Sequence, residues 1–475
     1  MRRKGQILSI VLATVMAMAS IGTGCGSGAG TSSGTTSGTV SETASTAASA
    51  GTASTTSASS DKASSSATAS SSGKSVTIKW LSQGTGETSW EGMTKPILEE
   101  YEKETGVHVD TEFYSFNDLF QVLETKASAG SSDFDVCSVD VTYVSKYGSS
   151  GYLEPLDSYF TDDEKAKWDK ASYSAGVWDN VMYAAPENTS TQELYYNKTL
   201  LDKAGITVPD NDADNRLTYE QVADLAKQAQ QKLDPDGSQG IIGFDFQQVS
   251  RVYQMNMLPN SMGGKNISDD GYSLDGVVNT DPWYNSMKWY QDLVNDGIAS
   301  KGYDADQLGE QFNAGKVVFM VGGTWTKKYM ECDDEIDCTY APCFKGYEKN
   351  VATSTGSWYF GVNSKSENKD AAAAFVKWFT LGKGSDMWLE INGDVPSRLD
   401  KQQEIQNDAN ASKDMKIAAY EAANTAVPRA VTPLFGEYST ALNEAWEDVR
   451  NGADIKDTLN QAIEKYKTAV DSAKK

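Results

Sequence analysis

The sequence predicts an α/β fold divided into more than one lobe, and three observations support this prediction. Strand and helix patterns alternate along the first part of the folded chain, between residues 76 and 147. The folded part runs from about Ser75 to Lys475, which exceeds the roughly 250–300 residues that one hydrophobic core usually serves. Apolar strand patterns return at Val317–Val321 and Trp358–Val362, after a stretch that is mainly helical.

The alternation begins with a strand and ends with a short helix. The first helix has Thr94 as its expected N-cap, Pro96 in its first turn and Gly106 as its stop. The expected elements are the strand Val76–Leu81, the helix from Thr94, the strand Val107–Phe113, a helix marked by Leu119, Phe120, Leu123 and Ala127, the strand Phe134–Val139, and a helix through Val144 and Tyr147. A βαβαβ order of this kind implies a parallel sheet with right-handed crossovers.

This topology predicts where a ligand binds, because ligands of open α/β sheets lie beyond the carboxyl ends of the strands. The segment after the first strand contains Gln83, Glu87 and Trp90, and the segment after the third contains Asp140 and Tyr143. Planar hydrogen-bonding groups can hold hydroxyls, and aromatic rings can cover the apolar face of a pyranose. We therefore expect these strand ends to suit a sugar.

The rest of the folded chain alternates long helical stretches with isolated strands. Residues 191–318 are mainly helical, with one helix opening at Asp281-Pro282. The strand at Val317–Val321 leads into Gly322-Gly323-Thr324-Trp325. A helix is expected over Ala371–Phe379, and the final helix carries Leu459, Ile463, Tyr466 and Val470 at the spacing of a core face.

Residues 1–24 have the pattern of a secretory signal peptide. Arg2, Arg3 and Lys4 form a positive region, and small residues precede Cys25. The apolar stretch between them, Ile7–Ile21, is shorter than the roughly 20 residues needed to span a bilayer. We therefore set this segment apart from the fold.

The run Ile21-Gly22-Thr23-Gly24-Cys25-Gly26 resembles a bacterial lipobox, in which the cysteine is lipidated and becomes the mature N-terminus. Gly22 departs from that pattern, which prefers a branched residue three positions before the cysteine. An ordinary cleaved signal is the alternative. After Cys25, residues up to 74 are almost entirely Ser, Thr, Ala and Gly, which predicts a disordered tether with a root-mean-square span of roughly 40 Å.

Composition argues against several partners and cofactors. The formal net charge of -24 argues against nucleic acid and against charge-driven binding to anionic lipid, so membrane contact is expected through the lipid anchor alone. His108 is the one histidine, so neither a zinc site nor another cofactor is expected. Cys332, Cys338 and Cys343 lie close together, and either a disulfide among them or buried free thiols would fit.

Five groups of segments along the folded chain carry a family resemblance. They are Tyr183–Pro186 with Leu194–Lys198 and Ala204–Ile206, Gly315–Lys316 with Gly322–Trp325, Ser357–Val362 with Ala371–Phe379, Asn392–Arg398, and Val427–Arg429. Their order and spacing extend over nearly all of residues 75–475. Together they resemble the bacterial extracellular solute-binding proteins, whose members include maltose- and trehalose-binding receptors.

The resemblance implies a periplasmic-binding-protein-like fold, in which hinge crossovers join two α/β lobes around a ligand cleft. It implies one lobe from residues 75–190 plus about 323–375, and another from 191–322 plus about 376–475. It also implies a monomeric, non-enzymatic lipoprotein on the extracellular face of the cell membrane. Such a protein would bind a di- or oligosaccharide and deliver it to the permease subunits of an ABC transporter.

The resemblance also assigns expected ligand contacts, each with a structural alternative. Asp140 corresponds to a carboxylate that holds sugar hydroxyls, or it caps the following helix. Trp325 and Trp358 correspond to rings that stack on sugar, although Trp358 could face the core instead. Arg398 corresponds to a late-loop arginine that holds hydroxyls, or it forms a structural ion pair.

Residues at the first crossover complete the expected site. Asn188 and Ser190 lie there, with an ordinary turn as the alternative. Gln83, Glu87, Trp90 and Tyr143 are expected contacts because of their place after strands. Gln247 and Arg251 do not align securely with the family pattern.

Two other classes of protein remain as alternatives. A secreted glycoside hydrolase would need only two suitably spaced carboxylates, and the chain has many. From Ser75 to Lys475 no Gly-x-Ser-x-Gly elbow, zinc motif or phosphate loop is present. A carbohydrate-binding surface adhesin would use the tether equally well, but it would not require a cleft between two lobes.

Overall fold

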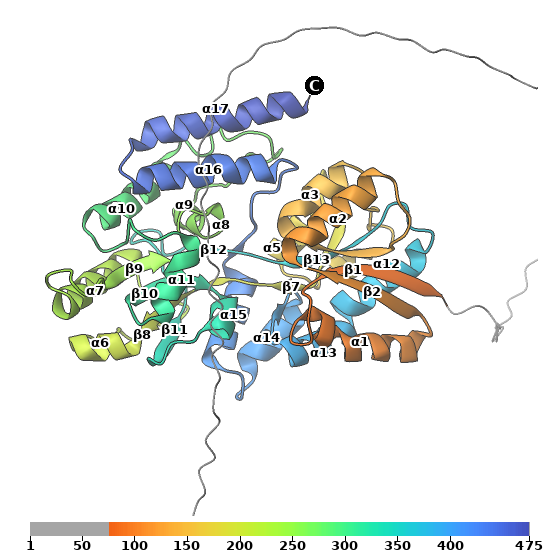
Figure 1. Cartoon of the computed structure of the whole chain (residues 1–475), viewed down its shortest axis with the longest axis horizontal. Coiled ribbons are helices and arrows are strands. Elements are labelled where there is room, and N and C mark those ends of the chain that lie inside the picture. The colour runs from red at the N-terminus through yellow and green to blue at the C-terminus, as the bar shows by residue number, and fades with distance from the viewer. Residues whose placement is uncertain (1–75, 475) are drawn as a thin grey trace, which may run out of the picture. The chain divides into compact units, whose positions relative to one another are not determined.

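The computed structural model describes residues 76–474, and the expected signal peptide, Cys25 and tether lie outside them. The described residues belong to one compact unit that contains two main sheets flanked by helices (Figure 1). Within this part of the chain, no helix combines the length and apolarity that a membrane span requires. The mixture of sheets and helices confirms the α/β class.

The first sheet has five strands, and its parallel core is the one that the sequence predicts. β1 pairs in parallel with β2 and with β3, whereas β13 pairs antiparallel to β3 and to β6. In spatial order the strands are β2 (His108–Tyr114), β1 (Thr77–Gln83), β3 (Val136–Asp140), β13 (Trp358–Val362) and β6 (Ala184–Pro186). The antiparallel β13 shows that a late segment returns to the sheet after the chain has left it.

Alternate side chains of these strands face two separate cores, as the two-residue period of a strand requires. Trp80 packs in one core and Leu81 in the other. The Trp80 side is covered by α1 (Trp90–Thr105), α12 (Lys369–Leu381) and α13 (Lys383–Asn392), and the Leu81 side by α2 (Phe116–Ser128) and α3 (Val141–Ser149). Burial on both faces suits the apolar β13, whereas the edge strand β2 carries His108, Asp110 and Glu112 and is only partly buried.

The first helix differs from its sequence prediction. α1 begins at Trp90, with Ser89 as the N-cap residue, and not after Thr94. The Thr94 hydroxyl donates to the Trp90 carbonyl one turn earlier, at 2.7 Å, so Thr94 lies inside the helix and does not cap it. Gly106 ends the helix in a left-handed conformation, as expected.

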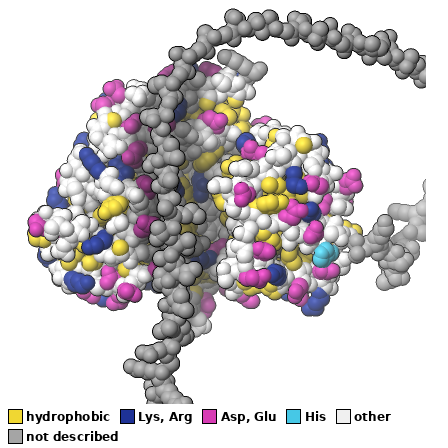
Figure 2. Space-filling model, viewed as in Figure 1, with side chains coloured by type: hydrophobic (Ala, Val, Ile, Leu, Met, Phe, Trp, Pro, Cys, Tyr) yellow, Lys and Arg dark blue, Asp and Glu magenta, His cyan; other side chains and the backbone are white. Residues whose placement is uncertain are grey.

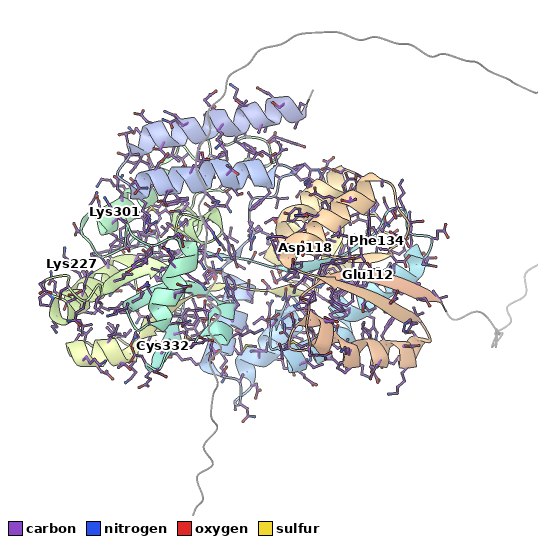
Figure 3. All side chains as sticks on the ribbon, viewed as in Figure 1. Glu112, Asp118, Phe134, Lys227, Lys301 and Cys332 are labelled. Carbon is purple, nitrogen blue, oxygen red and sulfur yellow. The ribbon has the colours of Figure 1, made fainter. Side chains whose placement is uncertain are left out.

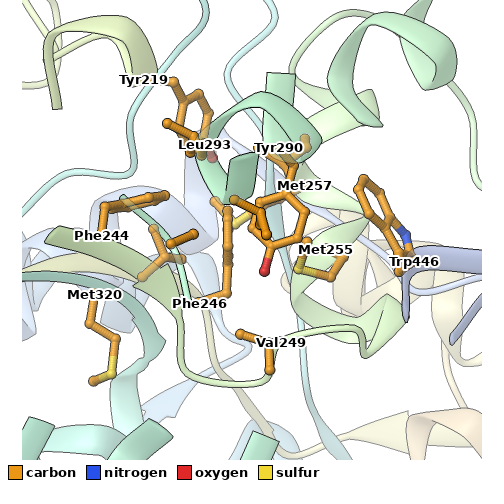
Figure 4. Packing of buried hydrophobic residues seen from close by; sticks show 14 of the residues in the cluster. Tyr219, Phe244, Phe246, Val249, Met255, Met257, Tyr290, Leu293, Met320 and Trp446 are labelled. Carbon is orange, nitrogen blue, oxygen red and sulfur yellow. The ribbon is translucent and has the colours of Figure 1, made fainter. Parts of the chain in front are cut away.

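The second sheet has four strands and one large core. β8 and β10 pair antiparallel, and β10 pairs in parallel with β9. The order is β11 (Ile336–Thr339), β8 (Gln192–Asn197), β10 (Val317–Gly323) and β9 (Ile242–Phe246). Phe244 and Phe246 pack there with Tyr290 and Trp446, whose helices lie far apart in the sequence (Figure 4).

The helices that contribute to this second core come from the middle and the end of the chain. They include α6 (Lys198–Ala204), α7 (Tyr219–Leu233), α8 (Val252–Met255), α9 (Met257–Asn260), α10 (Asp281–Asn295), α11 (Ala305–Asn313), α16 (Phe435–Arg450) and α17 (Ile455–Ala473). α15 (Lys413–Asn424) packs against β8 and β11. The helix predicted to open at Asp281 does begin there, and the predicted core face of the final helix is buried.

The remaining elements are short. They are α4 (Asp162–Lys165), α5 (Lys170–Ala175), β4 (Val177–Trp178), β5 (Val181–Met182), β7 (Asn188–Thr189), the 3₁₀ helix η1 (Thr324–Tyr329), β12 (Thr353–Ser354), β14 (Val395–Pro396), α14 (Leu399–Asn407) and β15 (Ala426–Val427). β7 pairs with β14, and β12 pairs with β15. These two small pairings tie together the segments that cross between the main sheets.

Two of the three predicted lobe limits, near 322–323 and 375–376, differ from where the chain crosses between the two main sheets. Residues 336–339 were expected in the first lobe, but β11 pairs with β8 in the second sheet. Residues 376–392 were expected in the second lobe, but Phe379 and Trp388 pack in the first core. The sequence pattern misplaced these segments because their positions depend on strand pairing and burial between residues far apart in the chain, and a local pattern does not report such contacts.

The four described cysteines are free thiols. Cys137, Cys338 and Cys343 are buried, and Cys332 lies half-buried in the loop before β11 (Figure 3). Of the two possibilities left open by the sequence, the structure therefore contains thiols and not a disulfide.

Acidic and basic side chains are interspersed over the face seen in Figure 2. Many form surface ion pairs, such as Lys383 with both Glu100 and Glu104. Exposed pairs of this kind contribute little to stability. The net negative charge of the protein, in contrast, affects its solubility and its choice of partners.

The chain first crosses from one main sheet to the other between β6 and β8, and this first crossing carries two buried glutamates. They are Glu187 and Glu193, each 1% exposed. Neither carboxylate oxygen of Glu193 has a hydrogen-bond partner among the described residues. Burial raises the pKa of Glu193 to about 8, and the nearby carboxylates Asp414 and Glu421 act in the same direction. Glu193 is therefore mainly protonated at neutral pH.

We predict that Glu193→Gln stabilises the protein at alkaline pH. Between pH 4.5 and about 8, the folded state keeps a proton that the unfolded chain has lost, so the free energy of unfolding falls as pH rises through this range. Gln cannot ionise, so the variant should lack this decline, which is on the order of a few kcal/mol. Urea denaturation at pH 5, 7 and 9 measures it, with the exposed Glu99→Gln as control. The prediction would be contradicted if the free energy of unfolding changed with pH in the same way for Glu193→Gln and for the parent.

Candidate functional site

A cleft of about 890 Å³ lies at the carboxyl ends of the first sheet. Gln83 ends β1 and Asp140 ends β3, and both line the cleft. The opposite side comes from α8, η1 and α16, which belong with the second sheet, and from Arg429. The predicted position beyond the strand ends is therefore where the cavity is found, and its volume is typical of small-molecule sites.

Aromatic rings form the wall on the first-sheet side. Trp358 begins β13, is half-buried, and lies 5.6 Å from Trp90 and 5.8 Å from Phe116 between ring centroids. Trp90 is 7% exposed and packs edge-on against Trp388, so it supports this wall from behind. Phe116 is 48% exposed and lies on the cleft side. An apolar surface of two accessible rings results, backed by the core.

A second stack of planar groups faces the cleft from the other side. The rings of Tyr253 and Trp325 stack with centroids 5.6 Å apart and planes 16° apart. The guanidinium of Arg429 lies 3.8 Å from the Tyr253 ring centroid, a cation–π contact. A β-carbon on Gly323 would lie 2.0 Å from the Trp325 indole. The absence of a side chain at Gly323 therefore lets the Trp325 ring fold back over its own chain.

Asp140 caps the following helix, which was the structural alternative, and it also lines the cleft. Its Oδ1 accepts from the Thr142 amide at 3.0 Å and from the Thr142 hydroxyl at 2.7 Å, so it caps α3. The same oxygen lies 3.7 Å from Arg429 Nη1, and Oδ2 takes no part in these contacts. Asp140 thus places a carboxylate oxygen beside a guanidinium at the cleft surface.

The polar residues of the first crossing hold the cleft together. Ser190 Oγ donates to the Gly356 carbonyl at 2.7 Å and lies 3.2 Å from the Tyr253 hydroxyl. Asn188 Oδ1 accepts from the Trp358 amide, and its Nδ2 donates to Asp394. Both residues line the cleft, but their side chains are largely committed to the protein.

Three of the predicted contacts do not line the cleft. Glu87 is exposed and pairs with Lys95 at 2.6 Å. Tyr143 stacks on Phe120, with centroids 4.0 Å apart, because its position on α3 turns it away from the strand end. Arg398 is 9% exposed and forms ion pairs with Asp386 and Asp400. For Arg398 the alternative interpretation, a structural ion pair, is the one that the structure supports.

Other residues of the cleft were missed. Tyr253 lies on a four-residue helix, too short to show a period, and Phe116 begins a helix whose pattern indicated only its core face. Arg429 belongs to a segment of the family resemblance but was not selected as a contact. Arg251, which did not align, does line the cleft.

Each carboxylate that lines the cleft lies beside a cation. Of the carboxylates, Asp140 lies beside Arg429, and Asp394 bonds to Lys328. Within residues 76–474 no three His, Cys, Asp or Glu side chains are grouped to hold a metal ion. The described site therefore offers rings and hydrogen-bonding groups for a ligand, and no metal cluster.

Comparison with known proteins agrees with this architecture. Residues 84–384 match the family model described as bacterial extracellular solute-binding protein. The galactooligosaccharide-binding protein of Bacillus subtilis is 23% identical over 413 residues, which cover 83% of this chain and 91% of that protein. Binding proteins of Brucella abortus are 28% identical over 240 residues, 48% of this chain and 54% of theirs, so the match spans about half the length of those relatives.

A solved structure shows the same fold. The cyclic α-maltosyl-1,6-maltose binding protein of Arthrobacter globiformis superposes with a TM-score of 0.71 at 18% identity, over 84% of this chain and all of that chain. This similarity confirms the periplasmic-binding-protein-like fold expected from the sequence.

We predict that Gly356→Ala destabilises the protein by roughly 1–3 kcal/mol, as overpacking usually does. An added β-carbon would lie 2.5 Å from the Tyr253 hydroxyl and 2.9 Å from both Arg429 Nη2 and Ser190 Oγ. Urea denaturation measures the change. The control is Gly309→Ala in α11, where an added β-carbon meets no atom within 4 Å and helix propensity should raise stability. Equal destabilisation of both variants would contradict the prediction.

Proposed function

The chain belongs to the bacterial extracellular solute-binding proteins, and on that premise we propose that it captures a di- or oligosaccharide in its cleft and delivers it to an ABC importer. The single observation that carries the proposal is the pairing of two aromatic surfaces around polar groups. Trp358 and Phe116 form one aromatic surface. Trp325, which stacks on Tyr253, forms the other on the opposite side of the cleft.

These groups match the two faces of a sugar. The C–H face of a pyranose is apolar and packs on aromatic rings. Its hydroxyls both donate and accept, so they can bond to Asp140 Oδ2 and to the Arg429 guanidinium together. Relatives named for sugars, including the galactooligosaccharide-binding protein of Bacillus subtilis, support this ligand class.

Binding without turnover is the expected behaviour. A glycoside hydrolase needs one carboxylic acid kept protonated, usually by apolar surroundings, and a second carboxylate at a suitable distance. The cleft carboxylates Asp140 and Asp394 each lie beside a cation instead. The family also consists of binding proteins. We therefore favour a receptor over an enzyme or an adhesin.

Delivery to the membrane would follow from closure of the cleft. The rings of its two walls come from parts of the molecule that contain different sheets. A sugar that contacts both walls binds the closed arrangement better and so shifts the population toward it. We propose that the permease recognises that closed arrangement, and that the receptor acts as a monomer.

Removing one hydrogen-bonding or stacking group should weaken binding. We expect Asp140→Asn to lower affinity, because the loss of a charged hydrogen-bond partner costs roughly 1.5–3 kcal/mol, or about ten- to a hundredfold. Asn keeps the capping ability of this position. Trp325→Ala should have a similar effect through lost stacking. Calorimetric titration with neutral di- and trisaccharides, including maltotriose and galactooligosaccharides, measures these changes.

The matched control is Glu87→Gln, which also removes one carboxylate charge but lies outside the cleft. It should bind like the parent. Arg398→Ala should likewise keep its affinity, with reduced stability. Chromatography after the titration should recover the sugars intact. Unchanged affinity in well-folded Asp140→Asn and Trp325→Ala would refute the assignment of the cleft.

We also propose that the protein is lipid-anchored at Cys25, the residue that follows the signal pattern. Two acyl chains on one cysteine would give the stable attachment that a single chain does not. Cys25→Ala should move the protein from the detergent phase to the aqueous phase on partitioning. Identical partitioning of the parent and the variant would show that no lipid is attached there.

A further inference from the structure

An ion pair between Lys328 and Asp394 joins two sides of the cleft. Lys328 lies on η1, which directly follows β10 of the second sheet. Asp394 lies just after α13, whose Trp388 packs in the first core. The two side chains are 39% and 24% exposed, so the pair is partly shielded from solvent. It therefore connects segments that belong with different sheets.

The helix that carries Lys328 also carries Trp325, one of the cleft rings. Side chains three residues apart in a 3₁₀ helix eclipse one another, so these two project from the same side of η1. Both line the cleft, and the Trp325 ring is held by its stack on Tyr253. The position of the lysine ammonium is therefore tied to the position of the Trp325 ring.

On the other side of the pair, Asp394 is connected to Trp358 through one amide side chain. Asn188 Nδ2 donates to Asp394 Oδ2 at 3.0 Å, and Asn188 Oδ1 accepts from the Trp358 amide at 2.9 Å. Asn392 reinforces the connection, because it accepts from Lys328 at 3.4 Å and donates to Asp394. A continuous chain of polar contacts thus runs from η1 to the strand that begins with Trp358.

A buried glutamate next to the pair influences which carboxylate the lysine meets. Glu187 is 1% exposed. Burial raises the pKa of Glu187 well above its usual value, the charge of Asp394 acts in the same direction, and Lys328 opposes them. The protonated form of Glu187 is therefore favoured, and the carboxylate that pairs with Lys328 is that of Asp394.

We infer that the Lys328–Asp394 ion pair sets the separation of the two aromatic walls of the cleft, and that Lys328 is a positioning residue for ligand capture. The inference rests on the proposed function of the cleft. With the pair intact, the Trp325 and Trp358 rings are held across the cleft before a ligand arrives, so binding spends less free energy on ordering them. Without it, arrangements with separated walls gain population, and the apparent affinity falls with the fraction that remains competent.

The neighbouring lysine supplies a matched control. Lys327 lies on the same helix and pairs with Asp414 of α15 at 2.6 Å. α15 packs against β8 and β11 of the second sheet, and Lys327 does not line the cleft. Lys327→Gln therefore removes the same charge from the same helix and leaves the pair of Lys328 with Asp394 intact. Lys328→Arg keeps both the charge and the ability to pair.

The first test is calorimetric titration of the full chain with maltotriose and galactooligosaccharides. Lys328→Gln should bind about two- to fivefold more weakly than the parent, as the loss of a partly exposed ion pair predicts. The difference should shrink as NaCl rises from about 0.05 to 0.5 M, because salt screens the pair. Lys327→Gln and Lys328→Arg should bind like the parent.

The second test measures the arrangement of the walls without any ligand. Nitroxide labels at the exposed positions Glu99 in α1 and Gln228 in α7 report the distance between the two parts of the full chain. The labels are attached through non-canonical amino acids, because Cys332 is a half-buried free thiol that would also react. We expect a longer and broader distance distribution for Lys328→Gln than for the parent, Lys327→Gln or Lys328→Arg.

The outcomes separate this inference from the proposed function. Identical distance distributions for the parent and Lys328→Gln overturn the inference, whatever the cleft binds. Equal effects of Lys327→Gln and Lys328→Gln also overturn it, because loss of charge on η1 would then be the cause. Parental affinity of Lys328→Gln overturns its positioning role. If no oligosaccharide binds the parent, the proposed function fails, and the distances measured without ligand still decide whether the ion pair sets the separation.

Discussion

The stacking of Arg429 on Tyr253 is the interaction on which the cleft depends. The guanidinium lies 3.8 Å from the ring centroid, with Trp325 stacked on the same tyrosine and Asp140 beside the guanidinium. These groups come from the late crossing segment, α8, η1 and the end of β3. The contact itself is worth about 0.5–2 kcal/mol. Its larger consequence is positional, since it brings a cation, two rings and a carboxylate together.

Close approach of backbone makes this arrangement sterically feasible. Gly323 lies under the Trp325 indole, and Gly356 lies among Tyr253, Arg429 and Ser190. A side chain at either position would occupy space that the stack uses. The first crossing adds buried polar groups, Glu187 and Glu193, whose protonation allows their burial. The centre of the molecule is thus polar and tightly packed, while the apolar cores lie to either side.

The secondary structure could largely be predicted because its signals are local. β13 occupies the predicted residues 358–362, and α10 begins at the predicted Asp281. The site could be predicted only in part. Asp140 was selected because it follows a predicted strand, and Trp325 because of the family resemblance; both line the cleft. Tyr253 was missed because its short helix has no period. The family resemblance included both Asn392–Arg398 and Val427–Arg429, but only Arg398 was assigned a ligand contact.

The sequence by itself determined the α/β class, the order of most strands and helices, and the strand ends at which the cleft lies, because apolar period and turn residues act over a few positions. Tertiary structure decided which late arginine faces the cleft, with which sheet residues 336–339 pair, and against which sheet residues 376–392 pack. Those outcomes depend on contacts between residues more than a hundred positions apart, such as Asp140 with Arg429 and Cys338 with Tyr195. No local pattern encodes such contacts, because they form only when whole elements have packed.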